Sequence, residues 1–304
     1  MPPAFQAVQI SDRVHWVGAI DWSVRNFHGY RTGRGTTYNA YLITSDPPIL
    51  IDTVKAPFRD EMLSRIAAVL DPATIRTIVS NHAEMDHSGC LPQVARLIEP
   101  DRIIASRMGA KALENHFHWN RDVQVASDGE RLELGDAALR FVEARMLHWP
   151  DSMFSYLEGD GVLFSNDGFG MHLASHERFV DQLAPQVWRY EAAKYYANIL
   201  LLFSPVVEKL LARLPSLDLD IQVIAPDHGP IHRRDPEEVI RLYGQWAAQQ
   251  PARKAVVVYD TMWQSTALMA RAIGEGLASA GTRVKVLPLE ASHRSDVVTE
   301  GLDA

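Results

Sequence analysis

The sequence is almost free of cysteine, since Cys90 is the only one among 304 residues. A single thiol excludes an internal disulfide, a four-cysteine iron site and an iron–sulfur cluster held by the cysteines of this chain. Any metal that the side chains bind must therefore use nitrogen and oxygen ligands.

Long hydrophobic runs and an excess of basic charge are missing as well. Apolar stretches such as residues 199–203 are far shorter than the roughly 20 residues that span a bilayer, and residues 1–10 lack the pattern of a signal peptide. Thirty basic residues against 38 acidic ones give no positive surface for nucleic acid or for an anionic membrane. We therefore expect a cytoplasmic protein that binds neither nucleic acid nor membrane.

Apolar residues, in contrast, make up 47% of the chain, which is ample for a buried core. Short β-rich runs, including residues 38–43 and 74–79, alternate with helical patterns such as residues 91–98, and this alternation indicates an α/β fold. The length exceeds that of one average domain. We predict two unequal domains, residues 1–249 and residues 250–304.

The segment Ser80–Cys90, SNHAEMDHSGC, concentrates side chains that bind metals. Four of them occur within six positions, directly after an apolar run that predicts a strand: His82, Glu84, Asp86 and His87. In an extended segment the first three would lie on one side and His87 on the other, so that one loop could serve two metal ions. The alternative is a polar turn before a helix, which is the commoner situation for a single histidine.

Three later strands end in the same way. The predicted strands 139–145, 161–164 and 221–224 are followed by LHWPDS, SNDGFG and APDHGP, which deliver His148, Asp167 and His228. Each residue alone is more often an ordinary polar residue beside a turn. Their recurrence at strand ends indicates a common site, because loops on a rigid scaffold commonly build one.

The C-terminal part shows the order strand, loop, helix, strand. A β-branched run at 255–259 precedes DTMWQST, and a second run lies at 283–287. The helix between them is expected to bury one apolar face: Leu268, Met269, Ile273 and Leu277. This order opens a doubly wound parallel sheet, and the hydroxyl-rich loop could cradle a phosphate. The alternative is a simple helix cap, since no glycine-rich fingerprint is present.

The order H-x-E-x-D-H, followed by His, Asp and His at later strand ends, resembles the metallo-β-lactamase superfamily. Its zinc hydrolases usually have H-x-H-x-D-H, whereas this chain has Glu84 at the second histidine. A carboxylate hardens the site and favours iron over zinc. Together with DTMWQST, the segments DWSVRNFHGY, RGTTYNAYLI and AKYYANI make nearly the whole chain resemble the flavodiiron proteins, the A-type flavoprotein family.

This resemblance implies a fold and a set of site residues. The fold would be an αββα metallo-β-lactamase-like sandwich followed by the first β–α–β of a flavodoxin-like sheet. One iron would be held by His82, Glu84 and His148, the other by Asp86, His87 and His228, with Asp167 bridging the two. The substrate pocket would be lined by His28, Trp149 and Tyr195. The phosphate of FMN would be held by Thr261, Met262, Trp263, Ser265 and Thr266.

The resemblance also implies an activity and partners. Family members reduce O2 to water or NO to N2O with electrons passed through FMN from a donor such as a rubredoxin or a flavin reductase. They form head-to-tail homodimers in which the FMN of one subunit faces the diiron site of the other. The flavodoxin-like part here stops after its first β–α–β, so we expect either a natural chain that continues past Ala304 or a partner subunit that covers the open sheet edge. Two alternatives remain, a non-catalytic O2-binding or O2-sensing diiron protein and a zinc hydrolase.

Overall fold

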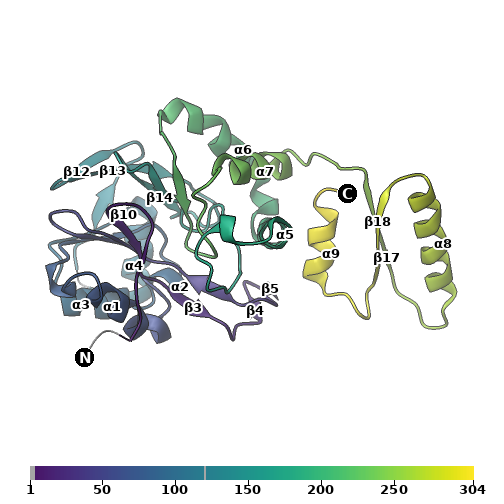
Figure 1. Ribbon diagram of the computed structural model, residues 1–304, viewed down its shortest axis with the longest axis horizontal. Helices are drawn as coiled ribbons and strands as arrows, with labels where there is room; N and C mark the ends of the chain where they lie inside the picture. Colours follow the sequence, from purple (N-terminus) through teal and green to yellow (C-terminus); the bar gives the residue numbers. More distant parts are fainter. Residues whose placement is uncertain (1–3, 120) are drawn as a thin grey trace.

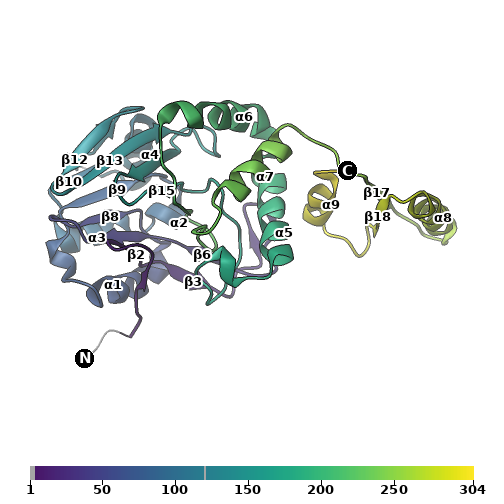
Figure 2. The same ribbon diagram turned by 45° about the horizontal axis from the view of Figure 1, so that its top comes forward.

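The computed structural model describes residues 4–119 and 121–304. Two β-sheets pack face to face, and helices cover the outer face of each sheet (Figure 1; Figure 2). A smaller β–α–β unit follows at the C-terminal end (Figure 1). The predicted order of layers, αββα followed by β–α–β, is therefore confirmed.

The first sheet has seven strands in the order β1-β2-β7-β8-β9-β10-β11. They are β1 (Val8–Gln9), β2 (Val14–Trp16), β7 (Tyr41–Ile43), β8 (Ile49–Ile51), β9 (Thr77–Ser80), β10 (Arg102–Ser106) and β11 (Gln124–Ala126). Strands β8 to β11 run parallel, whereas the pairs from β1 to β8 are antiparallel. The helices connected to this sheet are α1 (Arg59–Ala67), α2 (Met85–Ser88), α3 (Leu91–Ile98) and α4 (Arg107–Phe117), with short 3₁₀ turns at Ala56–Phe58 and Pro72–Thr74.

The second sheet has five strands in the order β12-β13-β14-β15-β16. They are β12 (Arg131–Leu134), β13 (Ala137–Glu143), β14 (Met153–Leu157), β15 (Val162–Phe164) and β16 (Val223–Ala225). Only the β15–β16 pair is parallel. The helical segments on this side are α5 (Pro185–Tyr195), the π-helical turn Tyr196–Leu200, α6 (Ser204–Arg213) and α7 (Glu237–Ala247), with 3₁₀ turns at Val180–Gln182, Leu201–Phe203 and Leu214–Leu217.

Alternation along the strands sends side chains to different layers of the core. Phe141 joins Tyr41 of the first sheet in the core between the sheets, whereas its neighbour Val142 joins Tyr196 in the core beneath α5 to α7. A third core lies between the first sheet and its helices, where Ile78 is buried. Successive side chains of a strand point to opposite faces of its sheet. Apolar side chains are buried on both faces of each sheet. The result is a rigid scaffold with its loops at the strand ends.

Two small hairpins lie outside the main sheets. Strands β3 (Ala19–Asp21) and β6 (Thr36–Tyr38) pair with each other, as do β4 (Asn26–Phe27) and β5 (Tyr30–Arg31). The turn between β4 and β5 contains His28 and Gly29, both with positive φ. Such a turn favours glycine at one position.

The C-terminal unit consists of β17 (Lys254–Tyr259), α8 (Ser265–Ser279), β18 (Arg283–Pro288) and α9 (Arg294–Gly301). Strands β17 and β18 pair in parallel and, within the described residues, with no strand of the larger sheets. Helix α9 instead packs against α5, against the π-helical turn and against β5. The domain boundary at residue 249 stays a prediction.

The predicted buried face of α8 is wrong for three of its four residues, and Leu277 is partly buried. Leu268, Met269 and Ile273 are more than half exposed, whereas Ala267 and Ala270 are buried. Helix α8 lies on a two-stranded sheet. Small side chains of the helix are buried, whereas most of its larger apolar side chains stay exposed. Across residues 4–119 and 121–304, no helix combines the length and the apolar character that crossing a bilayer requires.

Candidate metal centre

The predicted metal-binding residues lie where strands of both sheets end. His82 and Glu84 follow β9, and His148 follows β13. Asp167 and His228 follow β15 and β16, which are parallel and therefore end at the same edge of the second sheet. Strand β13 runs antiparallel to β14, which runs antiparallel to β15, so β13 also ends at this edge. The recurrence of ligand types at strand ends thus corresponds to proximity in space.

One detail of the predicted loop is wrong. Asp86 and His87 lie on the short helix α2 rather than in an extended segment that continues from His82 and Glu84. Glu84 is the residue that precedes this helix, and its backbone carbonyl accepts a hydrogen bond from the amide of His87. Asp86 therefore leaves the side of the chain that carries His82. This helical turn separates the loop into two pairs of side chains, one for each of two clusters.

The first cluster consists of His82, Glu84, His148 and Asp167. The Nε2 atoms of His82 and His148 lie 3.3 and 3.2 Å from Glu84 Oε2. The same two nitrogens lie 3.2 and 3.1 Å from Asp167 Oδ2. Two imidazoles and two carboxylates thus converge on one point.

The second cluster consists of Asp86, His87 and His228. The Nε2 atoms of the two histidines lie 3.3 and 3.1 Å from Asp86 Oδ2, and each lies 3.4 Å from Asp167 Oδ1. Asp167 therefore turns one carboxylate oxygen to each cluster. A carboxylate placed in this way can bridge two cations and offset their mutual repulsion.

The donor atoms fit metal ions in spacing and in chemistry. Two donor atoms about 3.2 Å apart can both lie about 2.0 Å from one metal ion, the usual length of a bond from a metal to imidazole nitrogen or carboxylate oxygen. The buried atoms that lack a hydrogen-bond partner among the described residues include the Nε2 atoms of His82, His87, His148 and His228, Glu84 Oε2 and both carboxylate oxygens of Asp86 and Asp167. Buried polar atoms without partners are costly, so this arrangement suits two bound cations.

The local electrostatics point the same way. Burial alone would lower the pKa of His87, but the carboxylates of Asp86 and Asp167 outweigh it and raise this pKa to about 10. Burial would likewise lower the pKa of His148, yet the nearby carboxylates of Asp167 and Glu84 outweigh it and raise this pKa to about 9. Without metal, the carboxylates hold protons on these imidazoles. Metal binding displaces such protons, because only neutral imidazole binds a metal.

Two groups behind the clusters orient histidines through hydrogen bonds and a third faces His87 without one, and the sequence prediction did not include them. His82 Nδ1 donates to Asp151 Oδ2 at 3.0 Å, and His228 Nδ1 donates to the carbonyl of Thr37 at 2.6 Å. Asp227 Oδ2 lies 3.5 Å from His87 Nδ1. Partners of this kind leave the other ring nitrogen free for a metal. Asp151 and Asp227 lie in LHWPDS and APDHGP and could have been noticed, whereas a backbone carbonyl leaves no signal in a sequence.

The predicted pocket residues surround the clusters. His28 Nε2 lies 3.1 Å from Glu84 Oε1, and the ring of Trp149 meets that of His82 edge to face at 5.3 Å. Tyr195 is fully buried, and its hydroxyl lacks a well-formed hydrogen bond within the described structure. His172, which the sequence prediction missed, lies 5.1 Å from the ring of Tyr195 and 4.5 Å from that of His228.

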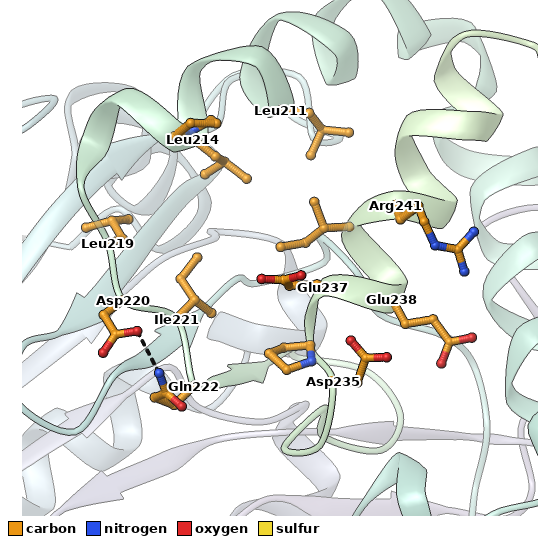
Figure 3. A pocket seen from close by; sticks show the side chains of 13 residues that line it. Leu211, Leu214, Leu219, Asp220, Ile221, Gln222, Asp235, Glu237, Glu238 and Arg241 are labelled. Atoms are coloured by element: carbon orange, nitrogen blue, oxygen red, sulfur yellow. Dashed lines mark hydrogen bonds between the residues drawn. The ribbon is translucent and has the colours of Figure 1, made fainter.

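Two cavities differ in their relation to the clusters. A cavity of about 300 Å³ is lined by Glu84 and Asp86 together with Phe27, Lys55 and Met85. A larger cavity of about 760 Å³ lies between α6, α7 and the approach to β16, with apolar walls such as Leu211 and Leu214 and acidic groups such as Glu237 (Figure 3). None of the predicted site residues lines the larger cavity, whereas two residues of the clusters line the smaller one.

The predicted phosphate cradle lies away from the clusters, in the C-terminal unit. Thr261 lines a small cavity of about 230 Å³ next to Gln264, whose φ of 68° is left-handed. Met262 and Trp263 are more than four-fifths exposed, and Ser265 and Thr266 form the first turn of α8. Ser265 and Thr266 are exposed, so their hydroxyl groups are accessible to a ligand, whereas the amide of Thr261 donates to Asp260 Oδ1 at 2.8 Å.

Comparison with known proteins identifies the family. Residues 36–229 match the family described as "ODP family beta lactamase". The chain is 44% identical over 302 residues to a nitric oxide reductase of Moorella thermoacetica, covering 98% of this chain and 76% of that protein. It is 43% identical over 303 residues to a rubredoxin-oxygen oxidoreductase of Megalodesulfovibrio gigas, covering 98% and 75%.

Solved structures agree with these relatives. The rubredoxin oxygen:oxidoreductase from Desulfovibrio gigas superimposes with a TM-score of 0.95 at 42% identity, over 98% of this chain and 76% of that one. The flavodiiron protein from Giardia intestinalis superimposes with a TM-score of 0.93 at 34% identity, over 99% and 74%. The resemblance predicted from the motifs is confirmed: this chain belongs to the flavodiiron protein family and spans about three quarters of the length of these relatives.

Proposed function

We propose that this protein is a diiron oxidoreductase that reduces O2 to water, NO to N2O, or both, with electrons delivered through FMN. The observation that carries the proposal is the position of the Asp167 carboxylate between the two clusters. Each of its two buried oxygens faces a different cluster, whose ligand atoms include several without a hydrogen-bond partner. The names of the relatives support the reaction class, since one is a nitric oxide reductase and another a rubredoxin-oxygen oxidoreductase.

Each cluster supplies an appropriate set of iron ligands. His82, Glu84 and His148 would hold one iron; Asp86, His87 and His228 would hold the other; Asp167 would bridge them. Glu84, Asp86 and Asp167 supply hard oxygen donors and negative charge, which stabilise iron more than zinc. About four protein ligands per iron leave positions open in an octahedral shell for a small molecule. When bound, the reduced iron pair would supply electrons to O2 or NO.

Side chains around the clusters would bind the substrate and handle protons. His28 contacts Glu84 Oε1 and so fixes the orientation of this carboxylate, which also lines the smaller cavity. Burial, followed by the negative charge of Asp167, raises the pKa of Tyr195 well above its ordinary value, so its hydroxyl stays protonated. A buried hydroxyl that keeps its proton can donate a hydrogen bond to a small molecule beside it. Trp149 packs edge to face against His82 on one side of the clusters.

The C-terminal unit would supply the flavin site. In the proposal, residues 1–249 form the iron domain and residues 250–304 begin the FMN domain, with Thr261, Met262, Trp263, Ser265 and Thr266 near the phosphate. Electrons would come from a donor protein such as a rubredoxin or a flavin reductase in the cytoplasm. A head-to-tail homodimer would bring the flavin of one subunit to the iron pair of the other.

Anaerobic stopped-flow spectroscopy tests the proposal. Protein loaded with iron and FMN is reduced, then mixed separately with O2 and with NO, while iron and zinc are measured on the same sample. We expect about two irons per chain and rapid oxidation by at least one gas. Oxidation with no turnover in the presence of excess reductant would indicate the O2-sensing alternative. Stoichiometric zinc in protein made under iron-replete conditions would indicate the hydrolase alternative.

A further inference from the structure

Helix α9 contacts both segments that carry the pocket residues His28 and Tyr195. It packs against β5, against the end of α5 and against the π-helical turn Tyr196–Leu200 (Figure 1). His28 lies in the turn that precedes β5, and Tyr195 is the last residue of α5. These two segments are far apart in the sequence, and α9 joins them from the C-terminal unit.

The first contact holds the turn of the β4–β5 hairpin. Arg294 Nη2 donates to the carbonyl of Gly29 at 2.9 Å. Within the described residues, β4 and β5 pair only with each other, and each is two residues long. A hairpin this short gains little stability from its own hydrogen bonds. His28 holds the turn on its inner side through Glu84, and Arg294 holds it on its outer side.

The second contact holds the residues that flank Tyr195. Lys194 Nζ lies 2.7 Å from Asp296 Oδ1, and the lysine side chain is only 8% exposed. Asn198 Nδ2 donates to the carbonyl of Ser295 at 3.3 Å and to Thr299 Oγ1 at 3.2 Å. A largely buried lysine is costly to leave without its partner. The segment also contains the π-helical turn, and such turns frequently occur at functional sites.

We propose that α9 is a clamp through which Arg294 and Asp296 position His28 and Tyr195 around the metal centre. It couples the C-terminal unit to the reaction, because loss of either contact frees a pocket side chain to move. Displacements of a fraction of an ångström at reacting groups are enough to slow a reaction. The inference rests on the proposed function, since the two positions matter only if a small molecule reacts at the clusters.

The test compares Arg294→Ala and Asp296→Ala with Arg283→Ala in the full chain loaded with iron and FMN. Arg283 is the control because it is likewise an exposed arginine of the C-terminal unit that donates a hydrogen bond, to Asp303 at 3.1 Å, but contacts neither pocket segment in the described structure. Hydrogen–deuterium exchange is followed in residues 25–32 and 194–200. In Arg294→Ala we expect exchange about tenfold faster in residues 25–32. In Asp296→Ala we expect the same increase in residues 194–200. Each increase follows from the loss of one charge-assisted hydrogen bond. Arg283→Ala should leave both segments unchanged.

Gas kinetics provide the second readout. Both clamp variants should keep two irons per chain, lose about tenfold in kcat for the better gas and change KM little. Arg294→Lys, which restores one donor, should recover part of the loss. Unchanged exchange in both segments, or an equal effect of Arg283→Ala, would overturn the clamp. A wild-type protein that loads iron but consumes neither gas would contradict the proposed function instead, so the two failures are distinguishable.

Discussion

Replacing Asp151 by Asn should weaken one iron site and spare the other. Asp151 is 2% exposed, and its Oδ2 accepts hydrogen bonds from His82 Nδ1 at 3.0 Å and from the amide of Ala83 at 2.7 Å. An amide oxygen at this position keeps an acceptor but loses the negative charge that makes the imidazole a better ligand. Loss of such a partner typically costs 10- to 100-fold in metal affinity, or about 1.4 to 2.7 kcal/mol.

The second cluster should retain its iron in this variant, because its histidines have other partners. His228 donates to the carbonyl of Thr37, and His87 faces Asp227. Asp227→Asn is therefore the matched control, with the opposite expectation of weaker binding at the second cluster. Titration with a competing chelator, followed by Mössbauer spectroscopy of the remaining iron, measures each site. Equal loss from both sites in Asp151→Asn, or loss from neither, would refute this assignment of ligands to clusters.

Three other changes test further parts of the account. Glu84→His creates the H-x-H-x-D-H pattern, so we expect the zinc-to-iron ratio of the purified protein to rise and its consumption of gas to fall. An unchanged ratio in metal analysis would contradict the preference for iron that we assign to this carboxylate. Burial lowers the pKa of His232 to about 4. His232 therefore binds a proton less readily in the folded state than in the unfolded state. As the pH falls from about 6.5 to 4, the free energy of unfolding decreases by at most about 3 kcal/mol. Urea unfolding of His232→Gln should show a shallower pH dependence in this range, and an identical slope would refute the assignment. Phe164→Ala, in the core between the sheets, should lower the free energy of unfolding by about 3 to 5 kcal/mol in urea titrations; a loss below 1 kcal/mol would contradict the packing described.

Features that depend on local pattern could be predicted from the sequence. The prediction of His148, Asp167 and His228 as ligands rests on their recurrence after apolar runs, since loops at strand ends of a rigid scaffold commonly build a site. The structure has a strand before each of them. The helix predicted at about residues 91–98 is confirmed as α3, Leu91–Ile98. The αββα order came from resemblance to a family rather than from periodicity.

Features that depend on contacts distant in sequence could not be predicted. The carbonyl of Thr37 orients His228 across 191 positions, and no side-chain pattern marks it. The place of Asp86 on α2 depends on a single helical turn that is too short to show a period. The exposed face of α8 resulted from the small area of the β17–β18 sheet, which the pattern of apolar residues does not reveal.

The bridging position of Asp167 is the central claim, and Mössbauer spectroscopy of the wild-type protein and Asp167→Ala tests it most directly. Since Asp167 Oδ2 faces His82 and His148, while Oδ1 faces His87 and His228, removal of this carboxylate takes a ligand from both sites at once. We predict two magnetically coupled irons per chain in the wild type and no coupled pair in the variant, whereas His148→Ala chiefly weakens one site. A coupled pair that survives in Asp167→Ala, or a wild type with stoichiometric zinc in place of iron, would contradict the account.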